Sequence, residues 1–223
     1  MIRTVIFDMD GVIVDTEPVH RYAYFQHFAD LGFTLTDEEY AQFTGASTKN
    51  VYQQLQQRFA LPHAVEELVL AKRARFNQAF DEQPGLELLA GVHALIEDLH
   101  AHGMQLILAS SASRSTIDRV MRRFNLGSYF AHLVSGEEFT RSKPDPAIFE
   151  HAASLATGPK AECVVIEDST NGVAAAKAAG LFCIGYRSEH SNLQDLSQAD
   201  LVIEHFNELS ASKVAALQPA LMP

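Results

Sequence analysis

The chain has 223 residues, of which 47% are hydrophobic, so it is long and apolar enough to bury a substantial core. Its formal net charge of -11 at pH 7 argues against nucleic acid or an anionic membrane as the main partner. No run approaches the roughly 20 apolar residues that span a bilayer, and the N-terminus lacks the features of a signal peptide, so we expect a cytoplasmic protein.

The first predicted element is a short buried strand in "TVIFDMD", which runs directly into two carboxylates, Asp8 and Asp10. Two like charges this close together cost energy when both are ionised, unless a cation or a shared proton offsets their repulsion. The pair therefore marks either a solvated turn or a functional site.

Residues 15–83 show helical patterns and no convincing strand. We interpret this segment as a helical domain inserted after the first strand, so that residues 1–14 and 84–223 form the second domain. The predicted helices are "TEPVHRYAYFQHFADLG", "TDEEYAQFTG", "TKNVYQQLQQRFA" and "AVEELVLAKRARFNQAF".

From about residue 84 onward, predicted strands alternate with predicted helices. Continuous apolar runs of this length are typical of strands buried on both faces of a parallel sheet. The fold class we predict is therefore α/β, with a Rossmann-like, doubly wound parallel sheet. The strands are expected in "QLILASS", "CVVIEDS", "FCIGY" and "LVI", and the helices in "GVHALIEDLHAHG", "STIDRVMRRFNLG", "KPDPAIFEHAASLA" and "STNGVAAAKAAG".

Two smaller features of this region also lead to predictions. Asp145 is a plausible N-cap for the helix in "KPDPAIFEHAASLA", with Pro146 at the first helical position. Cys163 and Cys183 lie in or beside apolar segments without CxxC spacing, so we expect two buried free thiols.

Polar residues that suit phosphate chemistry stand at the ends of these strands or beside the helix starts. Ligands of open α/β sheets bind beyond the carboxyl ends of the strands, so residues from separate segments can converge there. Such residues are Asp8 and Asp10 in the first segment, Ser110 and Ser111 in the second, Lys143 before "PDP", and Glu167 and Asp168 after "CVVI".

These residue types suit phosphoryl transfer. Four carboxylates supply oxygen ligands for Mg²⁺, while the Ser110 hydroxyl and the Lys143 ammonium suit a phosphoryl group whose oxygens carry negative charge. Asp8 is expected to act as nucleophile through an aspartyl phosphate. Asp10, two residues further along, is expected to serve as general acid and base.

Four segments of the chain resemble, in order and type, the motifs of the haloacid dehalogenase-like superfamily. They are "DMDGV", "LASS", "SKPDP" and "IEDSTNGVAAAKAAG". The resemblance is to the branch with a helical cap after the first motif, which contains β-phosphoglucomutase and many small-molecule phosphatases. The dehalogenases themselves fit poorly, because they need no metal and lack an aspartate matching Asp10.

The resemblance implies a role for each matching residue. Asp8 would be the phosphorylated nucleophile and a metal ligand, and Asp10 the general acid and base whose backbone carbonyl reaches the metal. Ser110 and Lys143 would bind the transferring phosphoryl group. Asp168 would complete the Mg²⁺ site, with Glu167 either a ligand or the partner of a ligand.

The helical insertion, residues 15–83, corresponds to the cap of the family. Thr16 and His20 match mutase residues that lie near the hinge and couple cap closure to the acid and base. The cap arginine and lysine with which the mutase holds a distal phosphate correspond to Thr48 and Ala74, although Lys49, Lys72, Arg73 and Arg75 lie close by. We therefore expect hydrolysis of a monophosphate.

Four further residues are candidates for substrate binding, each with a simpler alternative. Gly45 and Ser47 form either a cap loop over the substrate or a break between helices. Ser111 either contacts substrate or caps the following helix. Arg114 either contacts substrate or is a solvated charge.

The function that the sequence predicts is a Mg²⁺-dependent phosphatase for a small phosphorylated metabolite such as a sugar phosphate. We expect a monomer that binds neither nucleic acid nor membrane. One alternative is a sugar-phosphate mutase resembling β-phosphoglucomutase. Another is a phosphate-accepting signalling module, against which the helical insertion and the acid and base at Asp10 argue.

Overall fold

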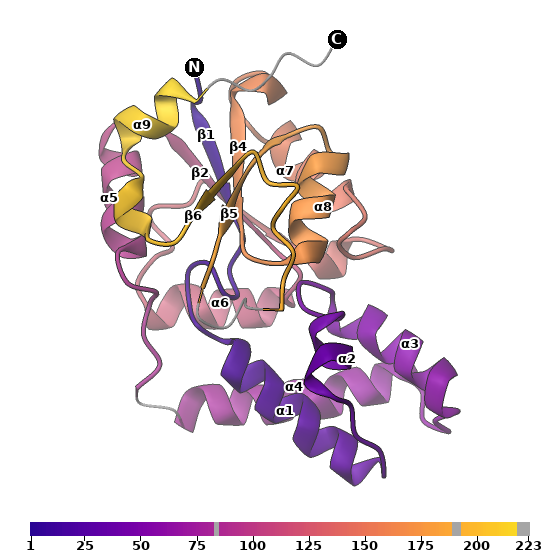
Figure 1. Cartoon of the computed structure of the whole chain (residues 1–223). Coiled ribbons are helices and arrows are strands. Elements are labelled where there is room, and N and C mark those ends of the chain that lie inside the picture. The colour runs from indigo at the N-terminus through magenta and orange to yellow at the C-terminus, as the bar shows by residue number, and fades with distance from the viewer. Residues whose placement is uncertain (83–84, 189–192, 218–223) are drawn as a thin grey trace.

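A six-stranded parallel sheet forms the centre of the computed structural model, which describes residues 1–82, 85–188 and 193–217 (Figure 1). The strand order is β3-β2-β1-β4-β5-β6, and every neighbouring pair runs parallel. This arrangement confirms the predicted α/β fold class. The strands are β1 (Thr4–Phe7), β2 (Gln105–Ser110), β3 (His132–Ser135), β4 (Cys163–Glu167), β5 (Phe182–Tyr186) and β6 (Leu201–Ile203).

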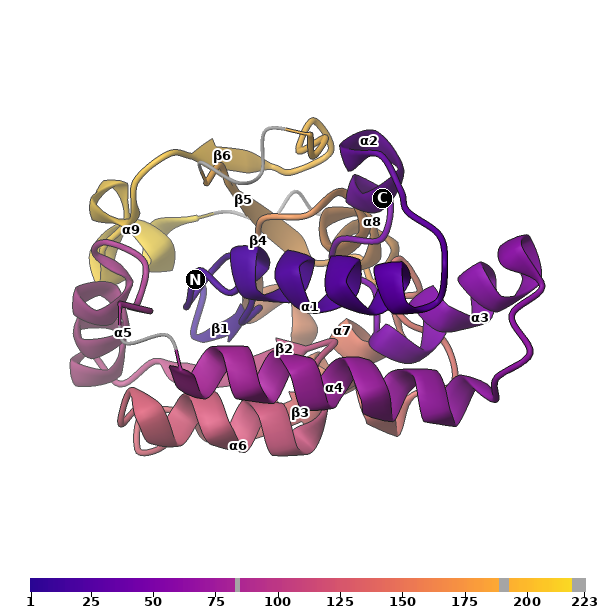
Figure 2. The ribbon, with the colours of Figure 1, turned by 90° about the horizontal axis from the view of Figure 1, so that it is seen from below.

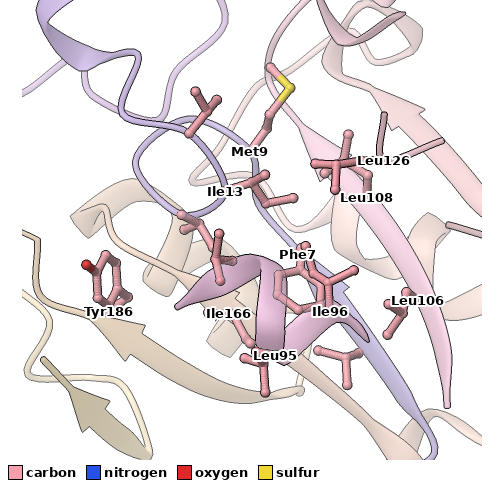
Figure 3. Close-up of a cluster of buried hydrophobic side chains, with 14 of the residues drawn as sticks. Phe7, Met9, Ile13, Leu95, Ile96, Leu106, Leu108, Leu126, Ile166 and Tyr186 are labelled. Atoms are coloured by element: carbon pink, nitrogen blue, oxygen red, sulfur yellow. The ribbon is translucent and has the colours of Figure 1, made fainter. Parts of the chain in front are cut away.

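Both faces of the sheet are covered by helices. Val5 and Phe7 of β1 face one buried hydrophobic cluster and Ile6 faces another, as the two-residue period of a strand requires. Figure 3 shows Phe7 in the first cluster together with Leu106 and Ile166. The first cluster contains residues of α5 (Val92–Ala101), α6 (Arg114–Arg123) and α9 (Ala211–Ala216), and the second contains residues of α7 (Ala147–Ser154) and α8 (Thr170–Ala178).

The strand β3 is an element that the sequence did not predict. It lies at the edge of the sheet, is four residues long, and buries only Val134 and Ser135 fully. Two apolar residues are too few to indicate a strand by their pattern. The N-terminus of α7 also differs slightly, since Pro146 is the N-cap, although Asp145 Oδ1 still accepts a hydrogen bond from the Ala147 N–H at 3.1 Å.

Between β1 and α5 the residues that the structure describes form four helices, as predicted. Figures 1 and 2 show them beyond the carboxyl end of the sheet. They share a hydrophobic cluster of their own, centred on buried residues such as Phe28, Tyr52 and Leu55. Phe76 and Phe80, in contrast, pack in the same cluster as Phe7. The helices are α1 (Glu17–Asp30), α2 (Asp37–Ala41), α3 (Thr48–Phe59) and α4 (Val65–Glu82).

Two connections join these helices to the sheet, and they lie side by side. Val14 forms an antiparallel bridge with Leu88, and the Leu89 N–H donates to the Ile13 carbonyl at 3.0 Å. The predicted domain boundary between residues 83 and 84 lies outside the described residues, so the division into two domains stays a prediction.

Two other predictions concern burial and membrane spans. Cys163 and Cys183 are both buried and free, as expected. Within residues 1–82, 85–188 and 193–217, none of the helices has the length and apolar character needed to cross a bilayer.

Candidate active site

The Lys143 ammonium is the centre of a buried polar cluster at the carboxyl ends of β1, β2 and β4. Its Nζ lies 2.5 Å from Asp8 Oδ1, 2.8 Å from Glu167 Oε1 and 3.2 Å from the Ala109 carbonyl oxygen. Burial alone would lower the pKa of Lys143, but the two carboxylates raise it above its ordinary value. Lys143 therefore stays charged and holds both carboxylates in place.

The register of the sheet brings these residues together. Phe7 pairs with Ile166 on one side and with Leu108 on the other, and the Asp8 N–H donates to the Ile166 carbonyl at 3.0 Å. Asp8, directly after β1, and Glu167, the last residue of β4, thus lie at the same level on neighbouring strands. A strand slip of one residue would separate them, because it moves each side chain to the opposite face.

Negative charge accumulates around Asp8 beyond what Lys143 neutralises. Burial raises the pKa of Asp8 to about 8, with Lys143 opposing and the charges of Glu167 and Asp10 adding to the effect. Burial, together with the charges of Glu167 and Asp8, also raises the pKa of Asp168 well above its ordinary value. A bound divalent cation would offset this repulsion.

The Glu167 carboxylate is fully occupied by protein partners. Its Oε1 accepts from Lys143, and its Oε2 accepts from the N–H groups of Asp168 and Ser169, both at 2.9 Å, and from the Ser169 hydroxyl at 3.0 Å. Of the two roles predicted for Glu167, this bonding favours the indirect one. Glu167 orients Lys143 and the start of α8.

Apart from Glu167, the oxygen donors near Asp8 fit a Mg²⁺ site in which a substrate phosphate completes the coordination. In the described part of the chain, no three carboxyl, imidazole or thiol side chains gather to hold a metal by themselves. Mg²⁺ commonly uses one or two carboxylates and completes its octahedron with water and substrate phosphate. Asp8, Asp168 and the Asp10 backbone carbonyl suit that pattern, whereas the Asp10 carboxylate has other partners.

The Asp10 carboxylate is held by two residues that follow it. The Thr16 hydroxyl donates to Asp10 Oδ1, and His20 Nε2 lies 3.3 Å from the same oxygen. The His20 ring stacks on Phe76 with 4.2 Å between centroids, and Lys72 Nζ lies 2.6 Å from its Nδ1. An ammonium only donates, so Nδ1 accepts from protonated Lys72 and the Nε2 proton faces Asp10.

The electrostatics of this chain keep Asp10 ionised in the absence of ligand. Burial alone would raise the pKa of Asp10, but the His20 ring, the Thr16 hydroxyl and the charge of Lys72 together lower it. Burial lowers the pKa of Lys72 to about 7, against the charges of Asp10 and Glu17. Burial and Lys72 lower the pKa of His20, so the imidazole is neutral at pH 7.

Lys72 is a residue whose place in the site the sequence analysis missed. The resemblance places Lys72 only near the position of the mutase lysine. The spacing of α4 indicates more, because Leu68, Lys72, Phe76 and Phe80 recur at intervals of four residues, and all four are buried. A lysine within such an apolar row indicates a buried cation with a partner.

A cavity of about 60 Å³ lies between the strand ends and α1, α2 and α3. Three residues predicted to bind substrate, His20, Gly45 and Ser111, line this cavity together with Asp8 and Asp10. The other lining residues are Glu17, Tyr24, Tyr40, Phe43, Thr44, Ala46, Thr48 and Ala112.

The two serines after β2 have different partners. Ser110 is fully buried, and its Oγ accepts from the Ala112 N–H at 3.0 Å. The Ser111 hydroxyl donates to the Gly45 carbonyl at 2.7 Å and so links the sheet to the α2–α3 connection. Ser111 is therefore itself part of the cavity wall.

Ser47 and Arg114 do not line this cavity. The Ser47 side chain caps α3 by accepting from the Asn50 N–H. The exposed Arg114 guanidinium bonds to Asp118 at 3.1 Å and to the Leu133 carbonyl at 3.1 Å. Ser47 thus marks the start of α3 after the break between α2 and α3, and Arg114 is an exposed charge with surface partners.

A second cleft of about 370 Å³ lies beside the cavity and shares Thr48 and Ser111 with it. Lys49 and Arg73 line this outer cleft, where Arg73 pairs with Glu137 at 2.6 Å. Arg75 instead pairs with Asp30. None of the four cations near the mutase positions lines the first cavity, and Lys72 contacts His20.

Comparison with known proteins identifies the family. The family described as "Haloacid dehalogenase-like hydrolase" matches residues 5–186. The chain belongs to this hydrolase family. It is 27% identical over 209 residues to validoxylamine A 7'-phosphate phosphatase of Streptomyces hygroscopicus subsp. limoneus, covering 94% of this chain and 96% of that protein. It is also 30% identical over 224 residues to beta-phosphoglucomutase of Bacillus subtilis, covering 93% and 92% of the two chains.

A solved structure from the same family has the same overall arrangement. A CbbY variant from Rhodobacter sphaeroides, crystallised in complex with xylulose-(1,5)bisphosphate, superposes with a TM-score of 0.82. The two chains are 27% identical, and the match covers 94% of this chain and 96% of the other. The superfamily resemblance and the expectation of a hydrolase are therefore confirmed.

Gly172 tests how tightly Glu167 is fixed. A Cβ at this position would lie 1.7 Å from Glu167 Oε1. Alanine forms helix more readily than glycine by about 1 kcal/mol, but the clash outweighs that gain because Lys143 and Ser169 hold the carboxylate. We expect Gly172→Ala to lower the free energy of unfolding in urea by about 1–3 kcal/mol.

Gly127→Ala is the matched control, because no atom lies within 4 Å of a Cβ there. Its free energy of unfolding should stay within about 1 kcal/mol of the parent value. A Gly172→Ala protein as stable as the Gly127→Ala protein would show that the Glu167 carboxylate can move.

Proposed function

We propose that this chain is a Mg²⁺-dependent phosphatase that hydrolyses a small phosphate monoester, such as a sugar phosphate, through an aspartyl phosphate. The observation that carries the proposal is the division of the two aspartates between two sets of partners. Asp8 bonds to Lys143 in the sheet, whereas Asp10 bonds to Thr16 and His20 at the start of the helical insertion. Membership of the hydrolase family and a relative named as a phosphatase support the proposal.

Asp8 is the nucleophile in this proposal. Lys143 binds Oδ1, so the second carboxylate oxygen is available to attack phosphorus while the ester P–O bond breaks. The Lys143 charge offsets the repulsion between this carboxylate and an incoming phosphate. Mg²⁺, held by Asp8, Asp168 and the Asp10 carbonyl, would supply further neutralisation of the phosphate oxygens.

Asp10 is the proton carrier. A bound phosphate ester adds negative charge next to Asp10, which raises the pKa of its carboxyl and favours the protonated form. Asp10 gives this proton to the departing alkoxide oxygen. It then accepts a proton from the water molecule whose oxygen attacks the aspartyl phosphate. The bond from phosphorus to Asp8 breaks, and inorganic phosphate leaves.

Residues 15–83 are proposed to act as a cap domain that excludes bulk water during the first step. Several hydrogen bonds join this segment to residues that follow β2, precede α7 or begin α8. Ser111 donates to the Gly45 carbonyl, the Ser47 N–H donates to Ser142 Oγ at 2.6 Å, and Asn171 Nδ2 donates to the Thr44 carbonyl at 2.8 Å. Such bonds can break and re-form as substrate enters and phosphate leaves.

A sugar-phosphate mutase is the second candidate, supported by the 30% identity to beta-phosphoglucomutase. A mutase holds a second phosphate while the first reacts, and this requires cationic groups on the cavity wall. Among the described residues that line the cavity there is neither lysine nor arginine. We therefore favour hydrolysis of a monophosphate over a mutase, and also over a bisphosphate like the one in the CbbY complex.

Asp8→Asn tests the nucleophile. An amide cannot form the acyl phosphate, so we expect kcat for phosphate release to fall by about 1000-fold or more. Asp10→Asn is the comparison, because it should block turnover while leaving Mg²⁺ affinity, measured by calorimetry, nearly unchanged. Circular dichroism would verify that both variants fold. Substantial phosphate release by Asp8→Asn would contradict the nucleophile assignment.

Product analysis tests the choice between phosphatase and mutase. After a screen of phosphorylated metabolites, the purified protein is incubated with Mg²⁺, a hexose 1-phosphate and a trace of the hexose 1,6-bisphosphate. We expect release of inorganic phosphate that stops on chelation and returns with added Mg²⁺. Accumulation of hexose 6-phosphate without phosphate release would establish the mutase. A long-lived aspartyl phosphate without turnover would establish a signalling module.

A further inference from the structure

Glu17 lines the catalytic cavity, and the chemistry proposed above gives it no role. It is the first residue of α1 and lies three positions before His20, so both residues occupy the same face of the helix. Both also line the same cavity as Asp8 and Asp10. A carboxylate placed here lies on the wall of the cavity into which an ester bound at Asp8 would extend its leaving group.

The bonding of Glu17 leaves acceptor capacity toward the cavity. The Tyr40 hydroxyl is the side-chain donor that lowers the pKa of the Glu17 carboxyl against the effect of burial. A carboxylate has two oxygens and accepts about four hydrogen bonds, so one phenol does not satisfy it. Burial raises the pKa of Glu17 to about 7, which reflects the cost of this incomplete solvation. A hydroxyl of a bound ligand would supply the missing donor.

The rest of the cap wall also favours neutral hydroxyl groups. Tyr24, Tyr40, Thr44 and Thr48 bring four further hydroxyl-bearing side chains to the cavity. Lys49 and Arg73, in contrast, line the outer cleft. The cation whose charge acts on the Glu17 carboxyl is Lys72, which is already bonded to His20. A second anion on the leaving group would meet Glu17 without a cation beside it.

We propose that Glu17 determines specificity by accepting a hydrogen bond from a hydroxyl of the leaving group and by repelling leaving groups that carry a second anion. The preferred substrates are then monophosphates of polyhydroxylated compounds. This inference rests on the proposed phosphatase function, since it concerns the leaving group of that reaction.

The test compares three esters across Glu17 variants. The esters are the best sugar monophosphate from the screen, fructose 1,6-bisphosphate, and p-nitrophenyl phosphate, whose leaving group has no further hydroxyl. We expect Glu17→Ala to lower kcat/KM for the sugar monophosphate about 10- to 100-fold, because a hydrogen bond to a desolvated group is lost. Its kcat/KM for p-nitrophenyl phosphate should change by less than about threefold.

Glu17→Gln separates charge from hydrogen bonding. The amide keeps the shape and one acceptor oxygen but removes the negative charge. We expect the ratio of kcat/KM for the bisphosphate to that for the monophosphate to rise about 10-fold. Glu38→Gln is the control, because this substitution removes the same charge from an exposed position on α2.

The possible outcomes distinguish this inference from the proposed function. Wild-type protein that hydrolyses none of the esters overturns the phosphatase and the inference together. Wild-type activity with equal losses on all three esters in Glu17→Ala would assign Glu17 a structural role and overturn the inference alone. Unchanged selectivity in both Glu17 variants would do the same. Thermal melting of each variant verifies that it folds.

Discussion

The buried Lys143 ammonium, bonded to Asp8 and Glu167, is the interaction on which the rest of the site depends. Each of the three charges is removed from water, and each is tolerated only because the others are present. Removing one partner would leave an uncompensated buried charge, so β1, β4 and the loop before α7 are fixed relative to one another. The Asp8 carboxylate is thereby positioned by the packing of the sheet.

The two aspartates of "DMD" differ because the chain turns between them. Asp8 continues the line of β1 toward Lys143, whereas Asp10 faces Thr16 and His20. Gly11, which follows at φ +80°, permits the turn and lets the Asp168 carboxylate approach within 2.1 Å of where a Cβ would lie. One short loop therefore connects a residue fixed by the sheet to a residue fixed by the helical insertion.

The sequence predicted those features that a local pattern or a single chain segment determines. Apolar runs located five of the six strands, and the polar residues at their ends converge because parallel strands share one carboxyl edge. The strand β3 was missed because it has only two apolar residues and is defined by its pairing with β2. The four-residue spacing on α4 indicates that Lys72 is buried, but its partner His20 depends on the packing of α4 against α1. The place of Glu17 depends on the packing of α2 over α1, which no local pattern encodes.

The strand-end residues could be predicted and the partner of Lys72 and the place of Glu17 could not, because the two groups are positioned by different kinds of contact. The phosphoryl transfer that we propose uses residues at the ends of strands, whose positions the hydrogen bonding of the sheet determines. The selection of the leaving group that we propose uses side chains from α1, α2, the α2–α3 connection and α3, whose relative positions depend on side-chain packing. Small changes in helix packing alter the cavity wall while Lys143 keeps Asp8 in place. The same reacting centre can therefore serve relatives that act on different phosphorylated compounds.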